Sequence, residues 1–268
     1  MNTKTTPGKA LITGASAGIG ATYADRLAAR GYDLILVARD AARLDKVAAD
    51  LKARHGVQVE VLPADLTDRN ELLRVEQRLR GDDGIAMLVN NAGMAVQGKL
   101  IDADIDSYTT MIELNVISVT RLAAAAAASF GKRGSGVIVN LASVLALAPE
   151  LFNGAYSGTK AYVLNLSQSM QAELAPLGVR VQAVLPGATR TEIWDRSGGS
   201  VSQLPPEMLM EVEDMVDAAL AGLDLGEAVT IPSLPEVADW NAFNAARQAL
   251  APNLSRNEPA ARYLSNAG

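Results

Sequence analysis

Short apolar runs alternate with longer helix-like stretches along most of the chain, and this alternation constrains the fold more than any other feature. Several runs are continuous Val, Ile and Leu, which is typical of strands buried on both faces of a sheet. The predicted strands are 9–13, 33–38, 57–62, 86–90, 136–142, 179–184 and 227–231, and the predicted helices are 18–30, 41–55, 69–80, 104–129, 155–177 and 210–224. The pattern predicts an α/β fold with a doubly wound parallel sheet of about seven strands, right-handed crossovers and helices on both faces.

The rest of the chain gives no reason to divide it. It has 268 residues, of which 49% are apolar, enough for one large α/β domain and too little for two. Because no repeat, linker or charge block interrupts it, residues 1–268 are expected to form a single domain. The aperiodic segment 188–206 contains Gly-Gly and Pro-Pro, and we interpret it as a substrate lid in which Ile193 and Trp194 form an apolar wall. Residues 252–268 read as a polar tail.

Composition removes several classes of function. The net charge is −6 and there is no basic stripe, so neither nucleic acid nor an anionic membrane is an expected partner. The chain has no cysteine and a single histidine, His55, so we expect no disulfide, no thiol nucleophile and no metal site. The first residues lack the apolar region of a signal peptide, and no run of 18 apolar residues suggests a membrane span. We therefore expect a cytoplasmic protein.

A glycine loop joins the first predicted strand to the first predicted helix. In the stretch LITGASAGIG the glycines are Gly14, Gly18 and Gly20. A helix N-terminus with exposed backbone N–H groups attracts phosphate, and glycine lets the backbone come close to it. The absence of a G-K-[ST] sequence argues against a nucleoside triphosphate loop. A tight strand-to-helix turn needs glycines in any case, but the position after the first strand favours a dinucleotide site.

The end of the second predicted strand bears on the choice of dinucleotide. NAD-binding units carry an acidic residue near this point to accept the ribose 2′-hydroxyl. Here Ala38 and Arg39 occupy the region, and a guanidinium can grip a 2′-phosphate with two parallel hydrogen bonds. Arg43 lies one helical turn further on. The alternative is a solvated Arg39 paired with Asp40. We favour NADP(H) over NAD(H).

Tyr156 and Lys160 stand four residues apart in a predicted helix and therefore share one face. An adjacent ammonium group stabilises a phenolate, so it is expected to lower the tyrosine pKa and permit acid–base chemistry near neutral pH. Ser143 follows the fifth predicted strand. Asn115 lies inside a predicted helix, where a polar residue competes with the backbone and needs a reason. Apart from Asn115, these groups cluster where the strands end, which is where an open α/β sheet binds its ligand.

Taken in order, these motifs resemble the short-chain dehydrogenase/reductase superfamily, which has a Rossmann-type fold. The matching elements are TGASAGIG at 13–20, NNAG at 90–93, Asn115, Ser143, YSGTK at 156–160 and PGATRT at 186–191. They span roughly residues 8–232. The resemblance implies one domain that both binds a nicotinamide dinucleotide and carries out the catalysis.

The resemblance also implies roles for single residues. Tyr156 would be the acid/base, Lys160 would bind the nicotinamide ribose and lower the tyrosine pKa, and Ser143 would orient the substrate oxygen. Asn115 would hold a water that links Lys160 to solvent. The expected cofactor contacts are Gly14, Ser16, Gly18, Ile19, Gly20, Arg39, Asp65, Leu66, Asn91, Ala92, Gly93, Tyr156, Lys160, Pro186, Gly187 and Thr191. One departure is Ala17, because many NADP(H)-preferring relatives have a basic residue there.

The expected function is hydride transfer between NADP(H) and a small carbonyl or alcohol substrate. The alternatives are a redox sensor that binds NADP(H) without turnover, and an epimerase or dehydratase on the same fold. Leu145, Leu147, Leu151 and Phe152 lie between Ser143 and Tyr156 and suggest an apolar substrate pocket. The resemblance further implies a homodimer or homotetramer that assembles through the helices near 104–129 and 155–177.

Overall fold

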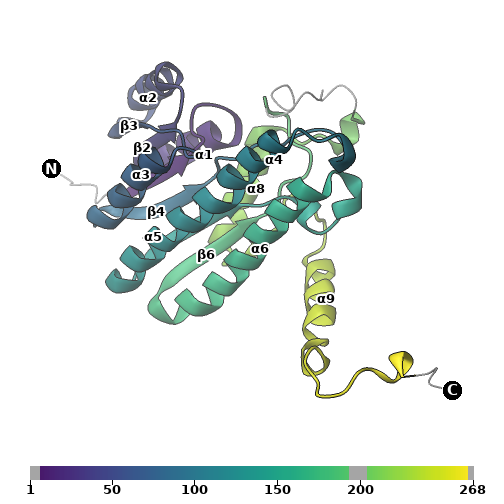
Figure 1. Ribbon diagram of the computed structural model, residues 1–268. Helices are drawn as coiled ribbons and strands as arrows, with labels where there is room; N and C mark the ends of the chain where they lie inside the picture. Colours follow the sequence, from purple (N-terminus) through teal and green to yellow (C-terminus); the bar gives the residue numbers. More distant parts are fainter. Residues whose placement is uncertain (1–6, 193–203, 265–268) are drawn as a thin grey trace. The chain divides into compact units, whose positions relative to one another are not determined.

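A computed structural model describes residues 7–192 and 204–264, and its main feature is a seven-stranded parallel sheet (Figure 1). The strand order is β3-β2-β1-β4-β5-β6-β7. The strands are β1 Lys9–Thr13, β2 Asp33–Ala38, β3 Val59–Pro63, β4 Ile85–Asn90, β5 Gly136–Leu141, β6 Val179–Val184 and β7 Val229–Thr230. The predicted doubly wound sheet is confirmed, because the order reverses between β1 and β4 and all neighbouring strands of this sheet pair in parallel.

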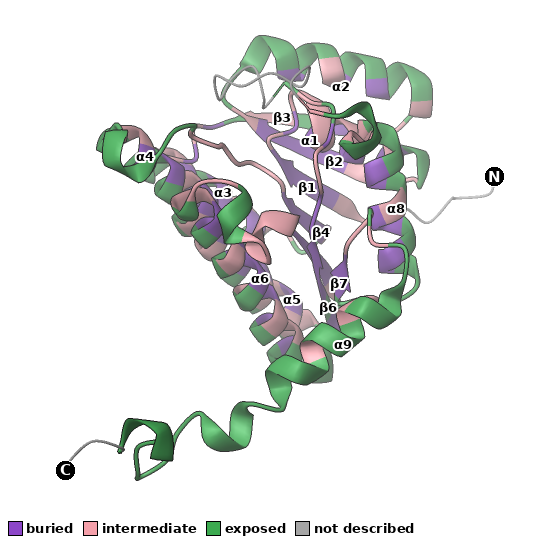
Figure 2. Ribbon diagram, turned by 90° about the vertical axis from the view of Figure 1, so that its right-hand side faces the viewer, coloured by how far each residue is buried: buried purple, intermediate pink, exposed green. Residues whose placement is uncertain are grey.

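Helices cover both faces of this sheet, and two apolar clusters form the core. One face carries α1 (Gly18–Ala29), α2 (Ala41–His55) and α8 (Val212–Asp224). The other carries α3 (Arg69–Gly81), α5 (Val119–Arg133) and α6 (Gly154–Leu174). Figure 2 shows the central strands β1 and β4 buried between these layers, whereas β3, at the edge of the sheet, is less buried. Continuous apolar strands are required here because both of their faces meet helices.

The strand residues divide between the two clusters by simple alternation. In β1, Ala10 and Ile12 face the first cluster while Leu11 faces the second. In β2, Leu36 and Ile35 divide in the same way. Each fully buried aliphatic side chain of this kind contributes about 1.5–3 kcal/mol to folding. The core therefore holds the strand ends, and the loops that leave them, in a fixed register.

The predicted helix 104–129 is interrupted. It consists of α4 (Ile105–Ile112), a π-helical segment (Glu113–Ser118) and α5. Within the described residues, the stretch Ile105–Arg133 is long and apolar enough to cross a membrane by length and composition, and 44% of its most apolar window is buried. Buried core helices of globular proteins meet the same test, and α5 contributes Leu122 and Phe130 to the core.

The chain divides into two compact units, Met1–Pro232 and Ser233–Gly268. The first unit carries the sheet. A single domain over residues 1–268 stays a prediction. The second unit contains α9 (Val237–Gln248), a helix that the sequence analysis did not predict. No residue of α9 is buried, and its Trp240 and Phe243 rings stack with centroids 5.6 Å apart.

Candidate active site

The carboxyl ends of the central strands bring the predicted motifs together. The glycine loop follows β1, NNAG ends β4, Ser143 follows β5, and Pro186 and Gly187 follow β6. β1 and β4 are neighbours at the point where the strand order reverses, which is where open α/β sheets bind their ligands. All of these motifs therefore lie at the carboxyl edge of the parallel sheet.

The glycine loop is packed so closely that side chains cannot replace its hydrogens. Gly14 and Gly18 have φ angles of +65° and +54°, in the left-handed region. A Cβ atom on Gly20 would lie 2.3 Å from the carbonyl oxygen of Gly14, and one on Gly14 would lie 2.7 Å from Nδ2 of Asn91. No side chain caps the N-terminus of α1, and its first turn holds no acidic residue. This cradle fits the pyrophosphate of a dinucleotide.

Thr13 connects the glycine loop to NNAG, and the sequence analysis did not single it out as a site residue. Its Oγ1 accepts hydrogen bonds from the backbone N–H groups of Asn91 at 3.0 Å and Ala92 at 2.9 Å. In return, Nδ2 of Asn91 donates to the carbonyl oxygens of Thr13 at 2.8 Å and Gly14 at 3.3 Å. The available signal was a threonine at the last position of a buried strand, directly before the first glycine.

We expect Thr13→Val to destabilise the protein by about 1–3 kcal/mol, because the isosteric side chain leaves two partly buried N–H groups without their acceptor. Thr13 is 2% exposed, so water cannot easily take its place. Urea denaturation followed by circular dichroism measures the effect. Thr13→Ser keeps the hydroxyl and is the control. Equal stabilities of the Val and Ser variants would contradict this role.

Asn115 lies in the π-helical segment rather than in a regular helix, and it is 1% exposed. Its side chain forms a closed pair with Met94, accepting from the backbone N at 2.9 Å and donating to the carbonyl oxygen at 2.8 Å. Nδ2 also donates to Oγ1 of Thr159 at 3.1 Å. A Cβ atom on Gly93 would lie 3.2 Å from Oδ1 of Asn115 and 3.5 Å from Nζ of Lys160, so Asn115 and Lys160 line the same small space. Such π-helical segments are frequent at functional sites.

Tyr156 stands in the first turn of α6, where Asn153 caps the helix by accepting from its backbone N at 2.8 Å. Ser143 hydrogen-bonds the phenol hydroxyl. Nζ of Lys160 lies 5.8 Å from the centre of the Tyr156 ring and donates to the carbonyl oxygen of Leu141 at 2.9 Å. The structure thus brings Ser143, Tyr156 and Lys160 together, and Asn115 reaches them through Thr159 and Gly93.

The pKa values run opposite to the sequence-based expectation for the tyrosine. Burial raises the pKa of Tyr156 to about 12, and the hydrogen bond with Ser143 offsets part of this. Burial lowers the pKa of Lys160 to about 8. The Lys160 ammonium group donates to the backbone carbonyl of Leu141, and desolvation is the largest influence on the Tyr156 hydroxyl. In this state the phenol is a proton donor at neutral pH.

The expected adenosine-side residues are in part brought together. Nη1 of Arg39 lies 3.9 Å from Oδ2 of Asp65, and the Arg39 side chain is 75% exposed. The alternative partner, Asp40, instead lies 3.6 Å from Nε of Arg43. Leu66 is buried and packs in the second apolar cluster. Ile19 is half-buried and packs against the first apolar cluster, while Ser16 is half-buried in the loop.

The segment after β6 returns across the site. The backbone N of Val144 donates to the carbonyl oxygen of Pro186 at 3.0 Å, which joins this segment to the end of β5. Oγ1 of Thr189 donates to Gly187. The side chain of Thr191 lies 3.4 Å from where a Cβ atom on Gly18 would be, so Thr191 rests on the glycine loop. Most of the expected lid 188–206, including Ile193 and Trp194, lies outside the described residues.

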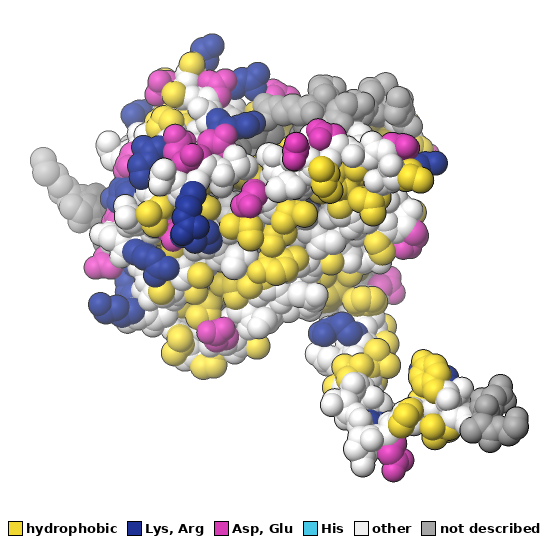
Figure 3. Space-filling view, in the orientation of Figure 1, with side chains coloured by type: hydrophobic (Ala, Val, Ile, Leu, Met, Phe, Trp, Pro, Cys, Tyr) yellow, Lys and Arg dark blue, Asp and Glu magenta, His cyan; other side chains and the backbone are white. Residues whose placement is uncertain are grey.

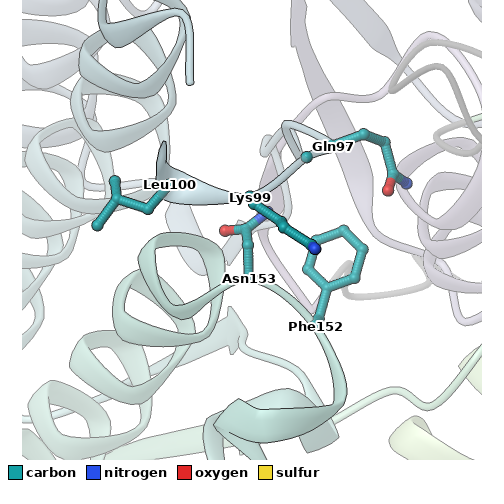
Figure 4. A pocket seen from close by; sticks show the side chains of 6 residues that line it. Gln97, Lys99, Leu100, Phe152 and Asn153 are labelled. Atoms are coloured by element: carbon teal, nitrogen blue, oxygen red, sulfur yellow. The ribbon is translucent and has the colours of Figure 1, made fainter. Parts of the chain in front are cut away.

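A cavity of about 400 Å³ opens beside α6 (Figure 4). Its lining residues are Gln97, Gly98, Lys99, Leu100, Phe152 and Asn153. The ring of Phe152, which lines the cavity, meets the ring of Tyr156 edge-on, with centroids 5.5 Å apart, whereas Tyr156 itself is not a lining residue. Of the apolar residues expected to form the pocket, Phe152 lines this cavity, whereas Leu151 is 72% exposed. In the figure Lys99, Phe152 and Asn153 lie at the centre, with Gln97 and Leu100 to either side.

Two solved structures match nearly the whole chain. A short-chain dehydrogenase from Sphingobium yanoikuyae in complex with NADPH is 52% identical, with a TM-score of 0.93 over 96% of this chain and all of the other. A bulky-bulky ketone specific alcohol dehydrogenase from Comamonas testosteroni is 46% identical, with a TM-score of 0.90 over 97% of this chain and all of the other.

Sequence comparisons agree with these structures. An uncharacterized oxidoreductase of Staphylococcus saprophyticus is 31% identical over 224 residues, which is 83% of this chain and 93% of the relative. The model of the short chain dehydrogenase family matches residues 8–199. With its fold, its motifs and these relatives in agreement, the chain belongs to the short-chain dehydrogenase family and is an NAD(P)-dependent oxidoreductase that acts on carbonyl and alcohol groups.

Proposed function

We propose that this enzyme reduces ketones with NADP(H), and that Tyr156 donates the proton. The observation that supports the proposal is that the half-buried Tyr156 lies near Ser143 and Lys160, at the same sheet edge as the glycine cradle. The nearby cavity, which Phe152 lines, offers room for a substrate on this side of Tyr156. A proton donor, a cradle for the cofactor and room for a substrate are what an acid-assisted hydride transfer requires.

The bound dinucleotide would supply the hydride, and the protein residues supply the proton and orient the substrate. Tyr156 gives its proton to the carbonyl oxygen as negative charge develops there, and Ser143 donates a hydrogen bond that orients this oxygen. Lys160 would hold the nicotinamide ribose with its ammonium group. Asn115, hydrogen-bonded to Thr159, keeps the region around Lys160 in place, and a water held there would return the proton to Tyr156.

The substrates that we propose are ketones with large groups on both sides of the carbonyl. The cavity lined by Phe152 is about 400 Å³, which is within the range of pockets for small organic molecules. The 46% identical enzyme of Comamonas testosteroni is described as specific for bulky-bulky ketones. A panel of small and bulky ketones with NADPH, followed by absorbance at 340 nm, tests the proposal. Cofactor binding without turnover of any of them would instead favour a sensor, an epimerase or a dehydratase.

The preference for NADP(H) rests on Arg39 and on the absence of an acidic residue at position 38. The exposed guanidinium of Arg39 is held only loosely, 3.9 Å from Asp65, and can turn to a 2′-phosphate. We expect Arg39→Gln to weaken NADPH binding about tenfold and to leave NADH binding within twofold, measured by the fluorescence of the bound cofactors. An equal loss for both cofactors would contradict the assignment.

The pH profile of reduction follows from the two buried groups. Tyr156, with a pKa of about 12, keeps its proton across the working range, whereas Lys160, with a pKa of about 8, loses its charge above that pH. We therefore expect kcat/KM for ketone reduction to be level below pH 7 and to fall above about pH 8. In Lys160→Arg the guanidinium stays charged, so its residual activity should lack this decline. A wild-type profile that stays level to pH 9.5 would refute the role of Lys160.

We also propose a homo-oligomer and a cytoplasmic location. The face formed by α4, the π-helical segment, α5 and α6 exposes large apolar side chains, visible as yellow patches in Figure 3. They include Ile105, Ile112, Ile117 and Tyr162. Patches of this kind mark interfaces in globular proteins. Light scattering should give a dimer or tetramer, and Ile112→Arg should shift it toward the monomer; a monomeric wild type would overturn this.

A further inference from the structure

An ion pair crosses the carboxyl edge of the sheet. Nη1 of Arg43, in the first turn of α2, lies 2.8 Å from Oε2 of Glu192, in the segment that follows β6. In the sheet, β1, β4 and β5 stand between β2, which leads into α2, and β6. Arg43 and Glu192 therefore join two segments that leave the sheet on opposite sides of the proposed cofactor crevice. Thr191, the neighbour of Glu192, rests on Gly18 of the glycine loop.

Carboxylates lie near both Arg39 and Arg43, the two arginines available to a 2′-phosphate at the end of β2. Arg43 holds Glu192 through Nη1 and lies near Asp40 through Nε, while Arg39 lies 3.9 Å from Asp65. Within the described residues, two guanidinium groups thus face three carboxylates. A 2′-phosphate that enters such a cluster meets repulsion as well as attraction. Of the three carboxylates, Asp40 also caps α2 and Asp65 also bonds Thr67, so both are tied to their own elements.

We propose that Glu192 is a specificity-determining residue that competes with the 2′-phosphate of the dinucleotide for Arg43. This competition weakens the binding of NADP(H) relative to that of NAD(H). The inference rests on the proposed function, because it presupposes a dinucleotide in the crevice. When Glu192 leaves Arg43, one negative charge moves away and Nη1 of Arg43 becomes available to phosphate. NAD(H) has no 2′-phosphate, so its binding does not require this exchange.

The test is the binding of NADPH and NADH to the Glu192→Gln variant, measured by cofactor fluorescence without substrate. The amide keeps the size of the side chain and removes its charge. We expect the dissociation constant for NADPH to fall about two- to fivefold, the size of effect typical for an exposed ion pair, while that for NADH stays unchanged. In an Arg43→Gln background the same substitution should leave the ratio of the two constants unchanged.

A second ion pair provides a matched control. Arg190 and Glu211 are also 2.8 Å apart, their side chains are 50% and 51% exposed, and Arg190 belongs to the same segment as Glu192. Glu211→Gln removes an equal charge and should leave the ratio of the two dissociation constants unchanged. A Glu192→Gln variant with the wild-type ratio, or with both constants changed equally, would overturn the inference while leaving the proposed function intact. Failure of the wild-type protein to bind either dinucleotide would instead defeat the proposed function.

Discussion

Tyr156→Phe should lower kcat for ketone reduction by about 10²–10⁴-fold, the usual contribution of a positioned general acid. The substitution removes one oxygen atom and keeps the ring that meets Phe152 edge-on. Because burial already disfavours the ionised phenol, loss of the hydroxyl should cost the fold little. The variant should therefore bind NADPH with nearly wild-type affinity, as measured by cofactor fluorescence.

The control for this variant is Tyr162→Phe, which alters another tyrosine of the same helix. Tyr162 is 39% exposed, and its hydroxyl lies 2.9 Å from Oγ1 of Thr120, away from Ser143. Its turnover should stay within about twofold of wild type, as is usual for exposed positions outside a site. Normal turnover by Tyr156→Phe would end the proposal of Tyr156 as the proton donor, even if cofactor binding were preserved.

Gly20→Ala should abolish detectable dinucleotide binding and lower the free energy of unfolding by about 2–4 kcal/mol. The added Cβ would lie 2.3 Å from the carbonyl oxygen of Gly14 and 2.5 Å from Nδ2 of Asn91. The first of these is a backbone atom and cannot rotate away. The loop must therefore open, which separates the N–H groups of the cradle from each other. Titration with NADPH and urea denaturation measure the two effects.

Gly81→Ala is the matched control for this substitution. Gly81 ends α3, and a Cβ atom there would have nothing within 4 Å. Alanine at that position should leave NADPH binding unchanged and stability within about 1 kcal/mol of wild type. If Gly20→Ala bound NADPH as tightly as Gly81→Ala does, the close packing of the loop would not be what forms the cofactor site.

Local pattern was enough to predict most of the sheet. The bounds predicted for β1, β2 and β6 are those of the structure, because a continuous apolar run buried on both faces has few other possible conformations. The secondary structure predicted from the sequence was less accurate for elements that are only partly buried. The last strand is two residues long rather than five, and α9, which has no buried residue, left no apolar periodicity to detect.

Contacts between distant segments account for what the pattern missed. The π-helical geometry at Asn115 accompanies its hydrogen bonds to Met94, 21 residues away, and to Thr159, 44 residues away. The role of Thr13 depends on NNAG, which is 78 positions further along the chain. Neither relation has a signature within a window of local sequence, since each exists only after β1, β4 and α6 are packed together.

By itself the sequence determined the order of strands and helices, the glycine loop and the identity of the residues that meet at the end of the sheet, because periodicity and spacing depend on neighbours along the chain. Only the tertiary structure decided the protonation of the site, the link through Thr13 and the Arg43–Glu192 pair. Burial reversed the expected direction of the Tyr156 pKa, and burial is a property of the whole packed unit. The physical reason is that desolvation and charge pairing depend on distances in space, which the chain acquires only by folding.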